Sequence, residues 1–295
     1  MPKYYEYPEK ESYSSIFIKL IIKLLNKKKA FEKAIEYYQK NQTIKKDLFE
    51  FPKPIFKNYD ILEFNGRNTY IFNKGKETDT IVLYFHGGAF LRNFYIFHWL
   101  FIKKLSSYSP YPIYAANYPL IPKHNYKEIL SFCKELYLTL SKKHKIILIG
   151  DSAGGNLCLS VIQNIPKENL PKKIVLLSPW LDVSMVNPLI DEYEKYDYIL
   201  NKKGLKLAGD LYSNNQPQLP EVSPLYFRYD TLPETHLFIG THDILFPDCE
   251  LFYKNNKNFM IYFYKFPKMV HDWMILELIP FKEAKKVHEI IKTLF

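Results

Sequence analysis

The sequence predicts an α/β protein with a mainly parallel central sheet flanked by helices, in a chain of 295 residues that suits one large domain or a core with a small lid. Six short apolar runs lack the alternation of half-exposed strands, which is typical of strands buried on both faces. They lie at residues 81–85, 113–116, 146–149, 174–177, 237–239 and 261–263. Amphipathic stretches with helical spacing separate or follow them, at residues 94–107, 126–140, 153–164, 247–255 and 281–294. Strands that alternate with helices imply crossover connections, and these place helices on both faces of a parallel sheet.

The first fifty residues are predicted to be a separate helical segment. Apolar residues recur at steps of three and four within residues 15–46, and Pro52 and Pro54 end this pattern. We therefore expect an N-terminal helical cap segment at residues 1–50 and a core domain at residues 51–295.

Two features stand outside the alternation of strands and helices. Residues 55–64 and 69–72, divided by Asn65-Gly66, are typical of a β-hairpin because Asn-Gly favours the tight turn that joins two strands. Residues 180–220 form a polar, tyrosine-rich helical insertion between two strands. We expect this insertion to rise above the sheet as a second cap element beside the N-terminal helices.

The basic composition does not by itself indicate a nucleic-acid partner. The net charge is +10, but only three of the 41 basic side chains are arginine, the residue that reads phosphates and bases in a bidentate manner. The lysines are scattered along the chain, as expected for a solvated basic surface. We therefore expect no nucleic acid among the partners.

Cysteine usage and the N-terminal sequence favour a cytoplasmic protein. Cys133, Cys158 and Cys249 are an odd number without the spacing of a zinc site or a disulfide framework. The apolar run at residues 16–25 carries Lys19 and is too short for an integral membrane span, and no signal-peptide cleavage site is present. An amphipathic helix that packs on the core is favoured, and a weak contact with a membrane surface is left open.

The clearest motif is Gly150-Asp151-Ser152-Ala153-Gly154, a G-x-S-x-G pattern placed directly after a predicted strand and before a predicted helix. A turn this sharp holds Ser152 at a strained backbone angle, so the residues around it must be small. The turn projects the serine hydroxyl above the carboxyl edge of the sheet. The N–H of Ala153 then points at any oxyanion formed there. So short a pattern also occurs by chance, so the interpretation depends on its partners.

A second glycine cluster, His86-Gly87-Gly88-Ala89, follows the predicted strand at residues 81–85. Two adjacent glycines at a strand end allow bare backbone to approach a ligand, and their N–H groups can face a developing negative charge. The alternative is a glycine turn with His86 hydrogen-bonded in the core. That alternative explains the loop but not its pairing with the serine turn.

A serine nucleophile needs a base that takes its proton and an acid that orients the base. His271 is the expected base, because it follows the strand that begins at residue 261 and so lies at the same sheet edge as Ser152. The other downstream histidines occupy ordinary positions at a strand start, beside a candidate acid and within the last helix; they are His236, His242 and His288.

Asp243 is the expected acid, because it comes just after the preceding predicted strand. Asp248 is an alternative that lies one helical turn further on and should point elsewhere. Asp272 adjoins His271, and in most loop geometries its side chain would be directed away from that histidine.

These residues resemble the hormone-sensitive-lipase-like branch of the α/β-hydrolase family, which includes microbial carboxylesterases and acetyl esterases. The resemblance covers about residues 55–295. The matching stretches are His86-Gly87-Gly88, Gly150-Asp151-Ser152-Ala153-Gly154-Gly155-Asn156, Leu177-Ser178-Pro179-Trp180-Leu181-Asp182, Ser223-Pro224-Leu225, Gly240-Thr241-His242-Asp243-Ile244-Leu245 and the His271 loop, with Asn117-Tyr118-Pro119-Leu120-Ile121-Pro122 similar to a further family stretch.

The resemblance implies a fold, a site and an activity. The fold is an α/β-hydrolase fold with a helical cap built from the N-terminal helices and the insertion. The implied activity is hydrolysis of a small-molecule, short-chain carboxylic ester through an acyl-enzyme, without a metal or organic cofactor. The implied site joins a catalytic triad of Ser152, Asp243 and His271 to oxyanion donors from Gly87, Gly88 and Ala153.

Three positions depart from the family pattern: Ala89 replaces a third glycine, Asn117 replaces an acidic residue before the tyrosine, and Lys123 replaces an acidic residue after the proline. These departures bear on local hydrogen bonding and substrate range. Two alternative functions are an amidase or deacetylase with the same triad, and a non-catalytic ligand receptor on the same fold. The receptor is disfavoured because such receptors have lost the histidine that this chain retains at His271.

Overall fold

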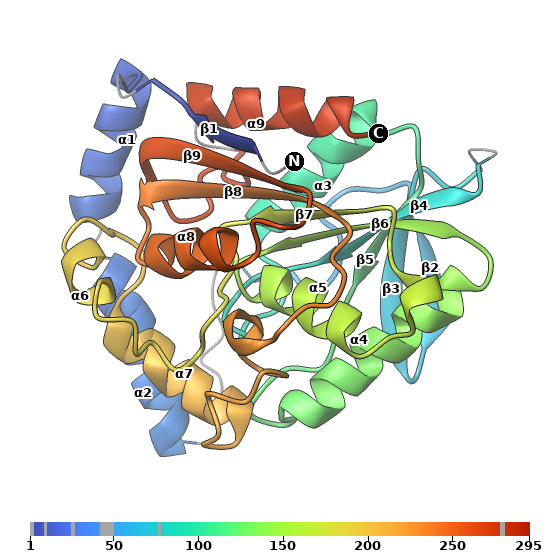
Figure 1. The fold of residues 1–295 in the computed structure, drawn as a ribbon, viewed down its shortest axis with the longest axis horizontal. Helices are drawn as coiled ribbons and strands as arrows, with labels where there is room; N and C mark the ends of the chain where they lie inside the picture. The colour runs from blue at the N-terminus through green and yellow to red at the C-terminus, as the bar shows by residue number, and fades with distance from the viewer. Residues whose placement is uncertain (1–2, 9–10, 25–26, 42–49, 76–77, 278–280) are drawn as a thin grey trace.

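The computed structural model describes residues 3–8, 11–24, 27–41, 50–75, 78–277 and 281–295. Figure 1 shows one sheet through the middle of the molecule, with helices on both sides. In chain order the elements are β1 (Lys3–Glu6), α1 (Tyr13–Leu24), α2 (Lys27–Asn41), β2 (Asp60–Phe64), β3 (Arg67–Phe72), β4 (Thr80–Phe85), α3 (Ile96–Tyr108), β5 (Ile113–Ala116), α4 (Tyr126–Ser141), β6 (Lys145–Asp151), α5 (Ala153–Gln163), β7 (Lys173–Leu177), α6 (Ile190–Tyr193), α7 (Lys202–Ser213), β8 (Glu234–His242), α8 (Phe246–Asn255), β9 (Ile261–Val270) and α9 (Lys282–Thr293).

Nine strands of the described residues form one sheet in the order β1-β9-β8-β7-β6-β4-β5-β3-β2. Neighbouring strands are parallel except for the pairs β2–β3 and β3–β5, which are antiparallel. The carboxyl ends of β4, β6, β7, β8 and β9 therefore lie side by side at one edge. The loops that follow these strands carry the glycine, serine, aspartate and histidine motifs of the sequence.

Successive side chains of the central strands belong to two different packing layers. In β4, Ile81 and Leu83 belong to the layer with α4, α5 and α8, whereas Val82 and Tyr84 belong to the layer with α3 and α9. All four side chains are completely buried. Helices cover each face of the sheet in Figure 1, and this two-sided burial explains why the strand sequences are apolar without alternation.

The predicted α/β architecture is confirmed. Each predicted apolar run lies within an observed strand, and each of the five predicted amphipathic stretches overlaps an observed helix. The hairpin turns at Asn65-Gly66, where both residues have positive φ angles of 46° and 72°, as the favoured two-residue turn requires. β1, a short exposed strand that pairs in parallel with β9, was not predicted.

The N-terminal segment contains two helices within the stretch whose apolar pattern is helical, and the pattern did not indicate where they divide. α1 ends at Leu24 and α2 begins at Lys27. The part of the predicted helix at residues 42–46 lies outside the described residues. Within the described part of the chain, no helix combines the length and the apolar character needed to cross a bilayer.

α2 lies beside α7, the longer helix of the 180–220 insertion (Figure 1). Lys203 Nζ on α7 donates to Glu32 Oε1 on α2 at 2.7 Å. Asn201 Nδ2, at the start of α7, donates to the Lys28 carbonyl at 2.9 Å. These contacts join the two segments that we assigned to a cap, and the cap itself stays a prediction.

The close approach of α5 to β4 generates a stability prediction. A Cβ atom on Gly154 would lie 2.0 Å from the backbone oxygen of Phe85, so Gly154→Ala must displace one of the two elements. We expect the free energy of unfolding, measured by chemical denaturation, to fall by about 3 kcal/mol. Gly66→Ala is the control, because a Cβ there has no neighbour within 4 Å and its positive φ costs only about 1 kcal/mol. Equal losses would contradict the packing described.

Candidate active site

Ser152 lies in the sharp turn between β6 and α5. Its φ of 49° and ψ of −117° lie outside the regions that residues with side chains normally adopt. Two backbone hydrogen bonds hold the turn: the Ser152 N–H donates to the Leu177 carbonyl at 2.8 Å, and the Ser152 carbonyl accepts from the Trp180 N–H at 3.0 Å. A Cβ on Gly150 would lie 2.3 Å from the Gly154 carbonyl oxygen, so only glycine permits the first turn of α5 to approach β6 this closely.

The structure brings together the three residues that the resemblance grouped as a triad. His271 Nε2 is 3.0 Å from Ser152 Oγ, and His271 Nδ1 is 2.9 Å from Asp243 Oδ2. Ser152 follows β6, Asp243 follows β8 and His271 follows β9, so one edge of the sheet positions all three. The exposed fractions of Ser152, Asp243 and His271 are 6%, 0% and 5%. Asp243 Oδ1 also accepts from the Leu245 N–H at 2.9 Å, which fixes the carboxylate.

The alternative histidines and the alternative acid Asp248 have other partners. Asp248, in the first turn of α8, accepts from Asn187 Nδ2 at 2.7 Å and thus points toward the insertion, as predicted. Each of the three alternative histidines contacts a residue outside the triad: His236 contacts Glu234, His242 contacts Tyr196, and His288 contacts Tyr108.

Asp272 does not follow the prediction that its side chain points away from His271. Its Oδ2 lies 3.1 Å from His271 Nε2, the same nitrogen that faces Ser152. The loop passes through a left-handed φ of 52° at Asp272, a backbone angle that residues with side chains rarely adopt. Burial disfavours a charged His271, but Asp272 and Asp243 outweigh burial and raise the pKa of His271 well above its usual value. Burial raises the pKa of Asp272 to about 7.

Asp151, the residue before the serine, is the centre of a buried polar cluster that sequence reasoning missed. Its Oδ1 accepts from the Tyr84 hydroxyl, and its Oδ2 accepts from the Gly87 N–H at 2.9 Å and from His98 Nε2 at 3.2 Å. His98 Nδ1 accepts from the Tyr95 N–H at 2.8 Å, so Nε2 carries the ring proton. Burial alone would raise the pKa of Asp151, but His98 and Tyr84 lower it below its usual value. The sequence did offer one signal for this cluster: Asp151 is a charged residue placed between Gly150 and Ser152, two motif residues expected to be buried.

The Gly87 N–H is therefore already in use, which speaks against the expectation that it donates to an oxyanion. It ties the loop at 86–90 to the serine turn instead. Among the described residues, the N–H groups of Gly88, Ala89 and Ala153 have no acceptor. Gly88 has a positive φ of 109°, which glycine adopts without steric cost, whereas the positive φ of 55° at Ala89 is strained for a residue with a side chain.

His86 is a core histidine, as the alternative interpretation of the glycine cluster proposed. Its Nδ1 lies 2.7 Å from the Gly87 carbonyl, to which it donates, and its ring stacks on Tyr118 at 4.4 Å between centroids. Burial lowers the pKa of His86 to about 3. The neutral His86 side chain therefore stabilises the glycine loop through its hydrogen bond to the Gly87 carbonyl.

The insertion is anchored beside the site at its first residue, in its middle and just beyond its end. Asn156 Nδ2, one turn along α5 from the serine, donates to the carbonyls of Trp180 and Val222, both at 2.8 Å. Asp197, between α6 and α7, accepts from the Ile244 N–H at 2.9 Å, directly after the predicted acid. Residues of the insertion thereby support the loop that holds Asp243.

A strained serine at the end of a central parallel strand, with a histidine and a carboxylate beyond it, defines an α/β protein of the hydrolase class. The chain belongs to the family described as the alpha/beta hydrolase fold, whose model matches residues 82–275. That range begins in β4 and ends after the His271 loop, so it contains the whole site.

Individual relatives agree with this assignment. The chain is 31% identical to an esterase of Acinetobacter venetianus over 180 residues, which are 58% of this chain and 59% of the relative. It is 33% identical to the hormone-sensitive lipase of Mus musculus over 89 residues, 28% of this chain and 12% of that protein. A crystal structure of a candidate esterase from Staphylococcus aureus matches with a TM-score of 0.77 and 26% identity, covering 90% of each chain. The predicted resemblance is confirmed, although the chain spans less than two thirds of the length of these curated relatives.

The hydrogen bond between His98 and Asp151 generates a second stability prediction. His98→Leu removes a donor from a buried carboxylate, and we expect the free energy of unfolding to fall by about 3 kcal/mol. In the double variant with Asp151→Asn the carboxylate is gone, so the combined loss should be at least about 1 kcal/mol smaller than the sum of the single losses. Chemical denaturation of the four proteins measures this coupling, and additive losses would refute it.

Proposed function

We propose that the protein is a serine carboxylic ester hydrolase, a carboxylesterase or acetyl esterase that works through an acyl-enzyme. The observation that carries the proposal is the continuous hydrogen-bonded chain from Ser152 Oγ through His271 to Asp243 at the carboxyl edge of the sheet. Membership of the α/β-hydrolase family and similarity to an esterase support it.

In the proposed mechanism, Ser152 Oγ attacks the ester carbonyl carbon while His271 Nε2 takes the hydroxyl proton. Asp243 keeps the proton on Nδ1 in place and stabilises the imidazolium. The imidazolium then gives its new proton to the departing alkoxide, which leaves the acyl group on Ser152. A water molecule, deprotonated by His271, attacks this acyl group, and His271 returns the proton to Ser152 Oγ as the bond to the acyl carbon breaks and the carboxylic acid is released. Each step uses only this chain and water.

We assign the stabilisation of the tetrahedral oxyanion to backbone N–H groups of Gly88, Ala89 and Ala153. The set of donors expected from the sequence was Gly87, Gly88 and Ala153. We now assign Ala89 in place of Gly87, because the Gly87 N–H already donates to Asp151. The three assigned groups come from two strand ends that flank the serine. Donors that are fixed before the reaction stabilise the developing charge without a reorganisation cost.

A short acyl group fits the crowded surroundings of the glycine loop. Phe90 stacks on Tyr212 of α7 with 3.7 Å between ring centroids and 6° between planes, and lies 5.7 Å from the Trp180 ring. Ala89, directly before Phe90, is buried and adds a methyl group to this loop. We propose that segments 1–50 and 180–220 together form the cap over this region and select a small ester.

Two alternative functions would use the same fold. An amidase or deacetylase would use the same site and differ in the leaving group. A ligand receptor would bind without turnover.

The three cysteines are buried and free, which suits the reducing conditions of the predicted cytoplasmic location.

The proposal predicts covalent labelling of Ser152 by a fluorophosphonate, located by mass spectrometry of the labelled peptide. The same protein should hydrolyse p-nitrophenyl acetate, with kcat/KM falling as the acyl chain lengthens. Ser152→Ala should lose the label and at least about a thousandfold in kcat/KM, because the nucleophile is gone.

Ser160→Ala is the matched control. Ser160 is a buried serine of α5, the helix that follows Ser152, and its hydroxyl donates to Asn156 Oδ1 at 3.1 Å, outside the catalytic chain. It should keep the label. A wild-type protein that takes up no label would overturn the proposal, and an ester bound tightly but recovered unchanged would favour the receptor.

A further inference from the structure

The exposed surface of α1 is mainly apolar: six of its seven exposed side chains are apolar, and the seventh is Lys23. Two of its apolar side chains, Ile18 and Ile22, pack on the core and are each 7% exposed. On the opposite face, steps of four, three and four residues align large side chains that are 53–88% exposed. With two flanking isoleucines these form what we call the α1 stripe: Tyr13, Ile16, Phe17, Leu20, Ile21 and Leu24.

The polar contacts of α1 lie on its buried side instead. Lys19 forms an ion pair with Glu11 and donates to the Lys268 carbonyl at 3.1 Å. Ser15 donates to Glu283 of α9. This arrangement is the reverse of an ordinary surface helix, whose polar side faces water. A continuous exposed patch of this kind marks a binding surface.

Charge indicates what this surface binds. Between Glu11 and Glu32 the sequence holds five lysines and no acidic residue. Of these, Lys19 is buried against Glu11, and Lys28 pairs with Glu194. Lys23 and Lys29 are exposed. Lysines beside an apolar helical face suit an anionic lipid surface. A second copy of the chain pairing through the same face would bring two such groups of lysines together, which is unfavourable.

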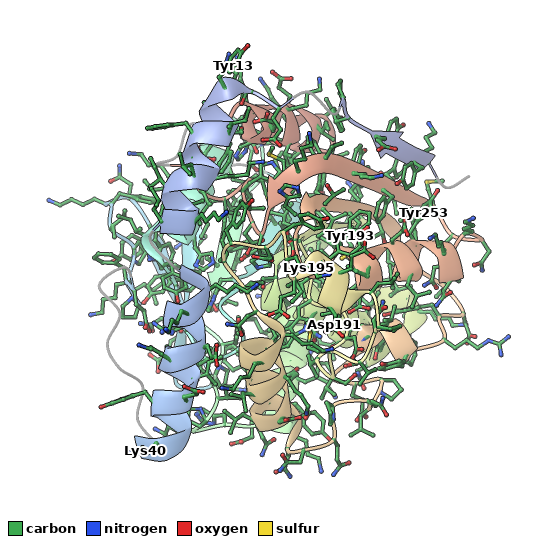
Figure 2. All side chains as sticks on the ribbon, turned by 90° about the vertical axis from the view of Figure 1, so that its left-hand side faces the viewer. Tyr13, Lys40, Asp191, Tyr193, Lys195 and Tyr253 are labelled. Atoms are coloured by element: carbon green, nitrogen blue, oxygen red, sulfur yellow. The ribbon has the colours of Figure 1, made fainter. Side chains whose placement is uncertain are left out.

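We propose that the α1 stripe binds the surface of an anionic lipid bilayer, with α1 lying in the plane of the membrane. Figure 2 shows α1 and α2 along one edge of the molecule, from Tyr13 to Lys40, where a flat surface can reach them. The predicted amphipathic helix does pack on the core, through Ile18 and Ile22, and the α1 stripe lies outside that contact. The Lys19–Lys268 contact places this surface on the side of the His271 loop.

Co-sedimentation with vesicles tests this proposal. The full chain should bind vesicles of equimolar phosphatidylcholine and phosphatidylglycerol, bind pure phosphatidylcholine more weakly, and lose affinity at high salt. Phe17→Ser with Leu24→Ser should lower the partition coefficient at least about tenfold, because both side chains would enter the acyl boundary.

Ile61→Ser with Val186→Ser is the matched control, because these apolar side chains are 52% and 54% exposed but lie elsewhere. It should bind as the wild type does. Thermal unfolding confirms that each variant is folded. Absence of binding to anionic vesicles would overturn the proposal. Sedimentation that shows a lipid-free dimer lost in Phe17→Ser would also overturn it, in favour of a second copy.

A second, independent observation concerns Asp272, and the inference from it rests on the proposed function. His271 Nε2 is 3.0 Å from Ser152 Oγ and 3.1 Å from Asp272 Oδ2. One ring nitrogen has either one proton or one lone pair to offer. To take the serine proton, that lone pair must be free and must face Ser152. The other Asp272 oxygen, Oδ1, is buried and has no hydrogen-bond partner among the described residues.

We infer that Asp272 is a positioning residue that sets the pH range of the reaction by sharing a proton with His271 Nε2. Catalysis begins only when that proton has left, so that the lone pair of Nε2 can accept the Ser152 proton. Asp272 and Ser152 thus compete for the same nitrogen.

Other charged groups face this pair. Asp243 lies at His271 Nδ1, Asp197 lies behind Asp243, and Asp151 lies beneath the serine turn with Tyr84 and His98 as its donors. The carboxylates hold the shared proton more firmly, which raises the pKa of His271. Activity should therefore rise with pH as the proton leaves. Removal of the Asp272 charge should move this rise to lower pH.

The test is the pH dependence of fluorophosphonate labelling and of kcat/KM. In Asp272→Asn the acid limb should move down by about one pH unit or more, a tenfold gain at the acid end relative to the plateau. Asp230→Asn, which removes an exposed carboxylate, should leave the limb in place. A lower rate at every pH with an unmoved limb would show a merely structural role and overturn the inference.

Nuclear magnetic resonance of the His271 ring separates this inference from the proposed function. The imidazole should titrate at lower pH in Asp272→Asn, or in Asp272→Ala if the amide variant does not fold. A shifted titration without any labelling would refute the ester hydrolase alone. An unshifted titration would refute the role of Asp272.

Discussion

The close contact between the end of β6 and the first turn of α5 is the constraint on which the site depends. Ser152 keeps its strained φ of 49° because the backbone packs so tightly that side chains are excluded on both sides of it. The chain has only ten glycines. Gly150 lies in this contact, while Gly154 and Gly155 allow the same turn to approach Phe85 of β4 and Pro179, and a Cβ at these three positions would lie 2.0–2.7 Å from a neighbouring atom. A chain poor in glycine thus uses it where the turn cannot tolerate any other residue.

The second constraint is electrostatic. Three aspartates, each at most 9% exposed, surround the serine and its histidine, and buried carboxylates are costly unless donors compensate them. Asp151 is compensated by a tyrosine, a histidine and a backbone N–H, and Asp243 by His271 and a backbone N–H. Asp272 has a less complete set of donors, since Oδ1 is unpaired. The His271 ring therefore lies between two acids: Asp243, whose charge is well compensated, contacts Nδ1, and Asp272, whose charge is less well compensated, contacts Nε2.

Much of the fold was predictable because its signals are local. The strands β4, β6 and β7 are buried on both faces, so their sequences are apolar throughout, and the hairpin turn follows from Asn65-Gly66. The positions of Asp243 and His271 were predictable as well, because each directly follows a strand of one parallel sheet. β1 was missed because a short exposed strand has no apolar pattern, and the break between α1 and α2 was missed because apolar spacing continues across it.

The sequence by itself determined the alternation of strands and helices and the order of the chemical motifs along the sheet edge, since both depend on neighbours in the chain. Only the tertiary structure decided which groups compete for one partner. The Gly87 N–H is taken by Asp151, Asp272 turns back toward His271, and the apolar face of α1 meets solvent while Lys19 is buried. Each outcome depends on contacts between segments far apart in the chain, and neither periodicity nor spacing carries that information.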